Sequence, residues 1–220
     1  MNPLLEKNRE TRNTYNSRLG ATVVKALEAN GFKARYAASS EEAVKAILEL
    51  VPEGSTVGVP GSSTIRELGL FETLESRGCS IFHHWDPSLA PEDRPQRWED
   101  ENTSDVFLTS SNGLTLDGML VNIDGTGNRV AAMAWGRNRI VFVVGINKVS
   151  PDVQSALQRI RDVATPLNAI SKGIDLPCAS VGHCVNCKVP QRFCRATLIL
   201  ERAPLGRDVH VIVVGENLGY

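Results

Sequence analysis

Apolar residues recur along the first part of the chain with a helical period, interrupted by short continuous runs. Residues 2–30 carry apolar side chains at near-helical spacing, and Gly31 follows as a helix stop. Ser39 predicts the start of a second helix, because Glu42 three positions later completes a capping box. A further helical stretch is expected to end at Arg77. Short apolar runs that predict strands lie at residues 32–37, 55–60 and 79–84. This alternation of helices and strands predicts a parallel sheet covered on both faces.

The pattern changes at residue 105. Asn-Gly, Asp-Gly and Thr-Gly pairs separate short apolar pieces over residues 105–136, which predicts a hairpin-rich β insertion. The apolar run 139–149 predicts a central strand, and residues 151–173 predict a long helix. Two apolar runs after the last cysteine predict the closing strands. No Pro-, Gly- or Ser-rich linker divides this order, so we expect one α/β domain over residues 1–220, with 1–30 as a helical arm.

Composition excludes several classes of protein. The net charge is only -1, so neither a nucleic-acid footprint nor a basic membrane-binding patch is expected. No apolar run approaches the roughly 18 residues of a membrane-spanning helix. The N-terminus is polar and has no apolar signal-peptide region. We therefore expect a cytoplasmic protein, in whose reducing compartment clustered cysteines bind metal or react more often than they form disulfides.

Four of the five cysteines lie in one short loop, "CASVGHCVNCKVPQRFC" (178–194). Cys184 and Cys187 form a C-x-x-C pair, the spacing at which one turn presents two thiolates to the same metal. Cys178 and Cys194 would complete four thiolate ligands, a set that selects Zn²⁺ or an iron–sulfur cluster. Spacing does not separate these two, and a metal-free redox pair is the alternative. Cys79 lies in a predicted strand and is expected in the core.

Hydroxyl residues follow the predicted strand 55–60 in the stretch "VPGSST". Backbone N–H groups and hydroxyls at the start of a helix favour an anion. The predicted phosphate or carboxylate cradle consists of Gly61, Ser62, Ser63 and Thr64. An ordinary helix N-cap is the alternative interpretation, and the residues alone do not decide between them.

A second candidate for ligand binding is the glycine-rich stretch 115–129. Its polar residues are Asp117, Asn122, Asp124, Asn128 and Arg129. An aspartate would act as a base and the arginine would pair with a substrate anion, although tight hairpins use the same residue types for their turns. Lys148 lies just beyond the apolar strand, where it would face the crevice at the carboxyl edge of the sheet, although a lone surface lysine is the commoner explanation. His83 and His84 also end a strand, and we interpret both as structural or surface residues.

With these stretches in hand, the chain resembles the lactate-utilisation (LUD) domain family, within the superfamily of ribose-phosphate isomerases, glucosamine-phosphate deaminases and CoA transferases. The resemblance rests on "VPGSSTIRELGL", "TSSNGLTLDGMLVNIDGTGNRVAAMAWG", "VVGINKV", "PCASVGHCVNCKVPQRFCR" and "VIVVGENLGY". It implies a Rossmann-like three-layer α/β core with a mixed, mainly parallel sheet. It also implies that the 61–64 loop corresponds to the phosphate loop of the sugar-phosphate enzymes, with residues 115–129 and Lys148 beside it.

The activity that the resemblance implies is oxidation of L-lactate to pyruvate, in a complex with iron–sulfur partner proteins. This chain lacks the tandem C-x₂-C-x₂-C-x₃-C-P runs of such partners, and it has no G-x-G-x-x-G fingerprint for NAD or a flavin. We therefore expect a component of organic-acid oxidation that binds a small anionic substrate, and the sequence leaves open whether it is catalytic alone.

Two other functions stay open at this point. The chain is alternatively an enzyme of the sugar-phosphate isomerase or CoA-transferase type, with Asp117, Asp124 or Lys148 in acid–base roles. It is otherwise a non-catalytic scaffold or regulatory subunit whose cysteine loop docks a partner. A homo-oligomer is compatible with each of these functions.

Overall fold

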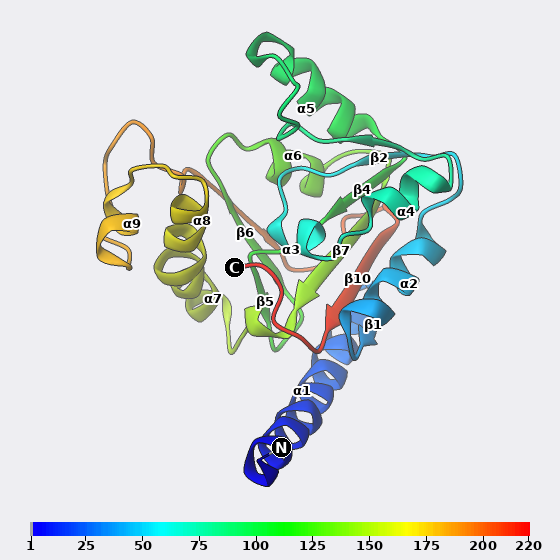
Figure 1. The fold of residues 1–220 in the computed structure, drawn as a ribbon, viewed down its shortest axis with the longest axis vertical. Coiled ribbons are helices and arrows are strands. Elements are labelled where there is room, and N and C mark those ends of the chain that lie inside the picture. The colour runs from blue at the N-terminus through cyan, green and yellow to red at the C-terminus, as the bar shows by residue number, and fades with distance from the viewer. Residues whose placement is uncertain (1) are drawn as a thin grey trace.

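The centre of the fold is a six-stranded sheet, in which every pair of neighbouring strands is parallel. The computed structural model describes residues 2–220, and Figure 1 shows the sheet running through the middle of the protein. The strand order is β1-β10-β7-β4-β2-β3. The strands are β1 (Lys33–Ala37), β2 (Thr56–Gly58), β3 (Ser80–Phe82), β4 (Val106–Thr109), β7 (Arg139–Gly145) and β10 (Val209–Val214). The continuous apolar runs of β7 and β10 place them at the centre, where a parallel strand is buried on both faces.

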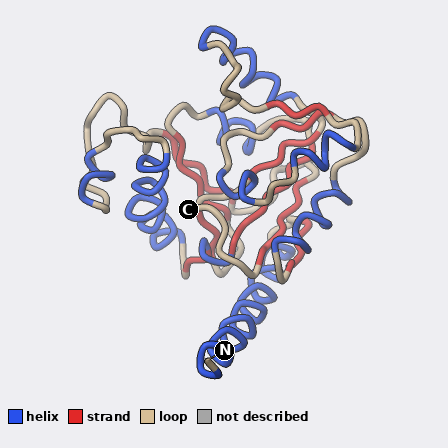
Figure 2. Tube along the Cα trace, in the orientation of Figure 1, coloured by secondary structure: helices blue, strands red, loops and turns tan. Residues whose placement is uncertain are grey.

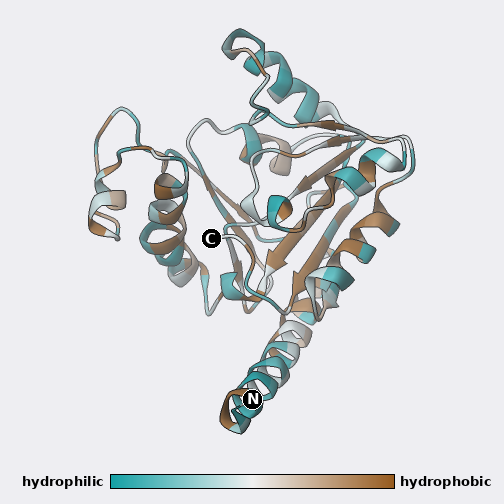
Figure 3. Ribbon diagram, viewed as in Figure 1, coloured by the Kyte–Doolittle hydropathy of each residue, from teal (hydrophilic) through white to brown (hydrophobic). Residues whose placement is uncertain are grey.

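Alternate residues of the central strands enter two separate cores. Val141 and Val143 of β7 pack under α2 (Ser40–Leu50), α3 (Ser63–Glu67) and α4 (Phe71–Ser76). Ile140, Phe142 and Val144 face the opposite core, under α1 (Pro3–Ala29) and α6 (Asn128–Ala134). Figure 3 shows the brown, apolar strands between the partly teal helices. The predicted α/β, three-layer, Rossmann-like fold class is therefore confirmed.

A second, four-stranded mixed sheet packs against this opposite core. Its order is β8-β5-β6-β9, with β5 and β6 antiparallel. The strands are β5 (Gly113–Thr115), β6 (Leu120–Asp124), β8 (Val149–Ser150) and β9 (Ala196–Leu200). Leu114 and Leu120 bury their side chains against the central sheet. The β5–β6 hairpin is the part of the expected insertion that the structure confirms.

A long helical segment flanks the second sheet. It consists of α7 (Val153–Arg159), the π-helical turn η3 (Ile160–Ala164) and α8 (Thr165–Ser171). The short helix α9 (Pro177–Val181) packs on α8, and Figure 2 shows the loop that follows it as a long tan segment at the edge of the protein. From residue 182 to 195 the chain has no regular secondary structure. This segment is therefore held by its side chains rather than by a helix or a sheet.

The remaining elements are α5 (Arg94–Thr103) and the 3₁₀ turns η1 (Pro91–Asp93) and η2 (Ile146–Lys148). The first turns of α1 extend away from the sheet (Figure 1), and the buried residues of this helix all lie in its second half. None of the helices within residues 2–220 combines the length and the apolar character that a membrane crossing requires.

Three boundaries differ from the sequence predictions. The helical stretch before Arg77 is two short helices, because Gly69 between them has a φ of +61°. The strand expected over 79–84 ends at Phe82, so both histidines lie beyond it. The expected insertion 105–136 is only partly a hairpin, since β4 belongs to the central sheet and residues 128–134 form α6.

Candidate functional site

A polar cleft opens at the carboxyl ends of the parallel strands, where ligands bind in open α/β sheets. Its volume is about 220 Å³. The loops that follow β2, β3, β4 and β7 all contribute side chains, together with the end of β6 and one face of the η3–α8 helix. The charged residues that line it are Asp124, Arg129, Lys148 and Lys172. The C-terminal residue Tyr220 lines it as well. Three cationic side chains against one carboxylate side chain make this cleft attractive to anions.

Lys148 is the most deeply buried charged group of the cleft, with only 3% of its surface exposed. It lies in η2, directly after the central strand β7. Its Nζ donates to Thr64 Oγ1 at 2.7 Å and to Ser110 Oγ at 3.1 Å. Burial, together with the positive charges of Arg159 and Arg129, lowers the pKa of Lys148 to about 7, against a smaller opposing effect of Glu67. No carboxylate within residues 2–220 lies within ion-pair distance of this amine.

An ammonium has three N–H donors, and the two hydroxyls occupy two of them. The third donor of Lys148 has no acceptor within the described part of the chain and is available to the cleft. A buried amine with one open donor and no carboxylate within ion-pair distance is a binding position for an anion.

The four residues predicted as an anion cradle all line the cleft, but they do different things. Gly61 has a φ of +62°, which turns the chain out of β2 toward the cleft. Ser62 is the N-cap of α3, because its Oγ accepts the N–H of Ile65 at 3.3 Å. Thr64 is buried and holds Lys148 in place. Because α3 has only five residues, its dipole is small and its N-terminus attracts an anion weakly. The positive charge beside the 61–64 loop therefore comes mainly from Lys148.

Asp124 and Arg129 form a buried ion pair at the end of β6. Arg129 Nε donates to Asp124 Oδ1 at 2.8 Å, and the same guanidinium donates to Asn112 Oδ1 and to the carbonyl oxygen of Ile123. Asp124 Oδ2 accepts the N–H of Val130 at 3.1 Å. Both side chains line the cleft, yet each is already hydrogen-bonded within the protein. They shape the wall of the cleft, and Lys148 remains its most deeply buried cation.

The other site residues predicted from the sequence lie at different positions relative to the cleft. Asn128 lines the cleft. Asn122 is fully buried beneath it, where its amide bridges the N–H of Asn112 and the hydroxyl of Ser111. Asp117 is not among the lining residues; it lies in the β5–β6 turn, and its carbonyl oxygen accepts from Asn30 beyond the end of α1. The structure therefore places one of the three acid–base candidates outside the cleft.

Several lining residues were not singled out from the sequence. Ser110 follows β4 and Lys172 ends α8, where burial lowers the pKa of its amine. His84 lies at the cleft beside Gly61, a position that the prediction of a structural or surface role does not include. The rule that selected Lys148, a polar residue just beyond the carboxyl end of a parallel strand, applies equally to Ser110 and His84.

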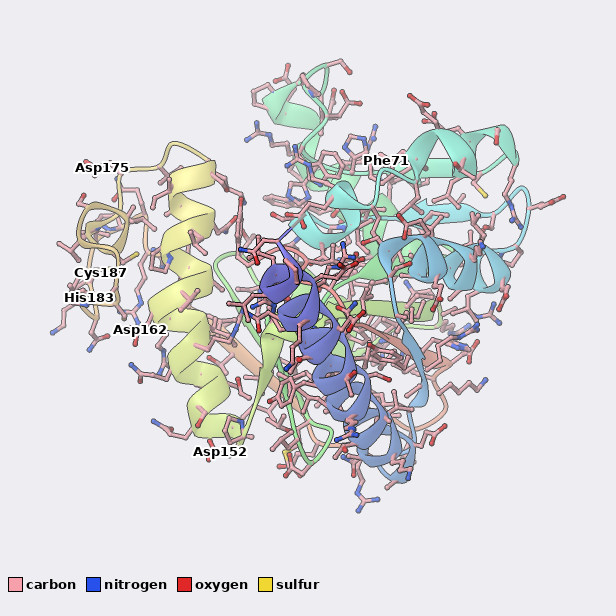
Figure 4. All side chains as sticks on the ribbon, turned by 60° about the horizontal axis from the view of Figure 1, so that its bottom comes forward. Phe71, Asp152, Asp162, Asp175, His183 and Cys187 are labelled. Atoms are coloured by element: carbon pink, nitrogen blue, oxygen red, sulfur yellow. The ribbon has the colours of Figure 1, made fainter. Side chains whose placement is uncertain are left out.

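All four cysteines of the 178–194 loop line one small, mainly apolar cavity. Cys178 is buried, and burial together with the other three thiols raises its pKa. The Cys184 N–H donates to Asp162 Oδ1 at 3.1 Å, and Figure 4 shows Cys187 in the segment that runs alongside Asp162. Arg192 Nε donates to the carbonyl oxygen of Cys194 at 2.7 Å. The thiols are free, and Cys79 lies apart in the core under α4.

The donor set fits a metal centre, although the loop is not arranged around one ion. No three His, Cys, Asp or Glu side chains within residues 2–220 form a group that could hold a metal ion. The cavity measures about 20 Å³, room for about one water. A Zn²⁺ ion would require the thiolates to approach to about 2.3 Å from it, whereas a cluster would require the cavity to widen. The irregular backbone from 182 to 195 permits either change.

The thiol cavity and the cleft share a wall. Thr165 and Phe193 line both spaces, and the η3–α8 helix separates them. Thr165 Oγ1 lies 3.5 Å from Cys194 Sγ. Only one layer of side chains therefore stands between the thiols and a ligand in the cleft.

Comparison with known proteins agrees with this architecture. Residues 21–214 match the LUD domain. The crystal structure of a DUF162 family protein from Deinococcus radiodurans superposes with a TM-score of 0.51 at 14% sequence identity, over 90% of this chain and 98% of that one. At this identity the likeness shows the fold alone, and no curated protein matches the chain. Because the matched residues span most of its length, the chain belongs to the LUD domain family.

Proposed function

We propose that the cleft binds a small 2-hydroxy or 2-oxo carboxylate, and that the chain is a component of L-lactate oxidation to pyruvate. The proposal rests on the environment of Lys148. Its amine is buried, and one of its N–H donors has no acceptor among the described residues. No carboxylate in this part of the chain, residues 2–220, pairs with it. A carboxylate is the counter-charge that this position lacks. The volume of about 220 Å³ suits a ligand of few atoms, since pockets for larger ligands begin near 300 Å³. Membership of a family linked to lactate utilisation supports the choice of acid.

Binding of such an anion is expected to be coupled to proton uptake. In the free cleft the pKa of Lys148 is about 7, so above this pH the amine is mainly neutral. A bound carboxylate favours the charged form and raises that pKa. Affinity for L-lactate and pyruvate should therefore fall as pH rises above 7, approaching about tenfold per pH unit because one proton is gained on binding.

Calorimetry at pH 8 in two buffers of different ionisation enthalpy measures this proton uptake directly. We expect uptake of close to one proton per L-lactate bound. Sugar phosphates and acyl-CoA form the comparison set for the isomerase or transferase alternative. Binding of those compounds, with no heat from L-lactate or pyruvate, would reject the proposed acid and favour the alternative.

We also propose that the four thiols hold a metal centre, an iron–sulfur cluster or Zn²⁺. The support is the convergence of Cys178, Cys184, Cys187 and Cys194 on one cavity. A cluster would supply electron transfer beside the cleft, whereas zinc would fix the loop. Basic side chains on the loop, among them Arg192 and Arg195, would offset the charge of four thiolates.

Metal content distinguishes these cases. Protein purified without oxygen is expected to contain close to one centre per chain, with visible absorption if the centre is a cluster and none if it is zinc. The double variant Cys184→Ser/Cys187→Ser should lose the metal, because two of four ligands are removed. Cys79→Ala is the matched control and should keep it, since Cys79 lies in a separate core. Neither iron nor zinc near one site per chain would remove the metal centre from the proposal.

A further inference from the structure

His84 is one of the residues that line the cleft, and its imidazole is held there in a defined orientation. His84 follows β3, and its ring lies over Gly61. A Cβ atom at residue 61 would lie 3.3 Å from both Cε1 and Nε2 of this imidazole. The Nε2 edge of the ring is therefore the edge that faces the loop at the mouth of the cleft.

The opposite edge of the ring is held by Glu101 of α5. Glu101 Oε1 accepts the backbone N–H of His84 at 2.6 Å and lies 2.8 Å from His84 Nδ1. Because this oxygen already accepts one N–H, the hydrogen-bond pattern assigns the imidazole proton to Nδ1. The neutral ring then presents an unprotonated Nε2 to the cleft, which is the arrangement that a proton acceptor needs.

Glu101 is completely buried, and burial raises its pKa. Its second oxygen, Oε2, has no hydrogen-bond partner within the described residues. Leaving a carboxylate in such a position is costly unless a positive charge compensates it. Protonation of His84 provides that charge, so the carboxylate stabilises the imidazolium once it forms. The same relation between a buried acid and a histidine orients the base in hydrolytic triads.

The surrounding packing fixes both partners. The backbone of Glu101 passes so close to β2 that a side chain at Gly58 would overlap its carbonyl oxygen. On the other side of the chain, His83 and Trp85 stack on one another at 3.8 Å between ring centroids, and both stack on Phe71. The flanking residues therefore anchor the loop, and His84 alone turns toward α5 and the cleft.

We propose that His84 and Glu101 form a proton-transfer pair for the ligand in the cleft. His84 Nε2 accepts the proton of the 2-hydroxyl group: the O–H bond breaks, an N–H bond forms, and the electron pair of the broken bond becomes part of the new C=O bond. The hydrogen on C2 leaves with its two electrons to a two-electron acceptor outside this chain. Glu101 is the positioning residue, which sets the tautomer and stabilises the imidazolium. This inference rests on the proposed function for the identity of the ligand.

Other charges near the pair are few. Arg97 on α5 faces Glu101, and Arg97, Arg66 of α3 and Asp86 surround His83 in the same loop. The cations of the cleft complete the set, with Lys148 the deepest. Among residues 2–220, Glu101 is the only carboxylate that pairs with His84. Changing Glu101 therefore isolates its effect on the imidazole.

Long-range ¹⁵N NMR of histidine-labelled protein tests the pair without any ligand, with His84→Asn used for assignment. We expect the Nδ1–H tautomer for His84 at pH 8. Glu101→Gln keeps the shape of the side chain but removes its charge, so the Nε2–H tautomer of His84 should become populated. Glu99→Gln, an exposed change on the same helix, is the control and should leave the tautomer unchanged. An Nε2–H tautomer in the wild type, or an unchanged tautomer in Glu101→Gln, would overturn the pair.

Ligand titrations test the role of the His84–Glu101 pair in proton transfer. L-lactate should shift the His84 Nε2 resonance toward hydrogen-bond acceptance, whereas propionate, which lacks the 2-hydroxyl, should bind through its carboxylate and leave that resonance in place. Lactate that binds without moving Nε2 would overturn the proton-transfer role. If L-lactate, pyruvate and propionate all fail to bind, the proposed function fails, and the tautomer of His84 in the wild type and in Glu101→Gln still decides whether the pair exists.

Discussion

Replacing Lys148 with methionine will remove most of the affinity of the cleft for small carboxylates. Methionine keeps the length of the side chain but has no N–H donor. A hydrogen bond to a charged group contributes about 1.5–3 kcal/mol, so the loss is expected to be about 10- to 150-fold in Kd for L-lactate. Calorimetry measures it, with Lys45→Met, an exposed change on α2, as the control. An unchanged Kd in Lys148→Met would contradict the central role of this amine.

The same variant also changes the pH dependence of stability. The folded pKa of Lys148 is about 7, below its ordinary value of 10.5, so the unfolded chain binds an extra proton between these two values. Stability of the unliganded wild type should therefore gain a contribution that rises with pH from about 7 to 10, and Lys148→Met should lack this contribution. Urea denaturation at several pH values, without anions in the buffer, measures the difference. Equal pH profiles would mean that the lysine is not desolvated.

Replacing Asp124 with alanine will destabilise the fold by about 3–5 kcal/mol, the usual cost of breaking a buried ion pair by removing one partner. The guanidinium of Arg129 would remain largely buried without its carboxylate, and the N–H of Val130 would lose its acceptor. Urea denaturation gives the free energy of unfolding. Asp117→Ala is the matched control, since that carboxylate lies in an exposed turn outside the cleft, and should cost far less.

A double variant separates the charge from the packing. Asp124→Leu/Arg129→Met removes both charges and keeps apolar volume, so it should be more stable than Asp124→Ala alone. If Asp124→Ala costs less than about 1 kcal/mol, the pair is more hydrated than its burial indicates.

Much of the fold could be predicted because the sequence patterns that indicate it involve residues close together in the chain. The apolar runs of β7 and β10 identify central strands, and Ser39 does cap α2 by accepting the N–H of Glu42. Lys148 could be placed at the cleft because its position depends only on the strand that precedes it. These inferences need no knowledge of which segments meet in space.

The features that the sequence patterns did not predict depend on contacts between residues that are far apart in the chain. The glycines before residues 128–134 predict a hairpin, but these residues form α6. The N-cap of α6 is Gly127, which has a φ of +91° and no side chain that could indicate the start of a helix. β4 is only four residues long, and its pairing with β2 and β7 decides its sheet. His84 and Glu101 are 17 residues apart in the sequence. No hydrophobic periodicity predicts that the residue after β3 will contact a residue of α5.

The π-helical turn η3 has a consequence for where this helical segment can change its length. A π turn holds one residue more than an α turn, so the extra residue is taken up locally. Deleting one residue within 160–164 is therefore expected to return the turn to α-helical geometry and to leave Thr165 facing both cavities. Deleting one residue within α7 would instead change the phase of the helix by about 100°. The π turn is thus the place in this segment where the loss of one residue preserves the wall shared by the thiols and the cleft.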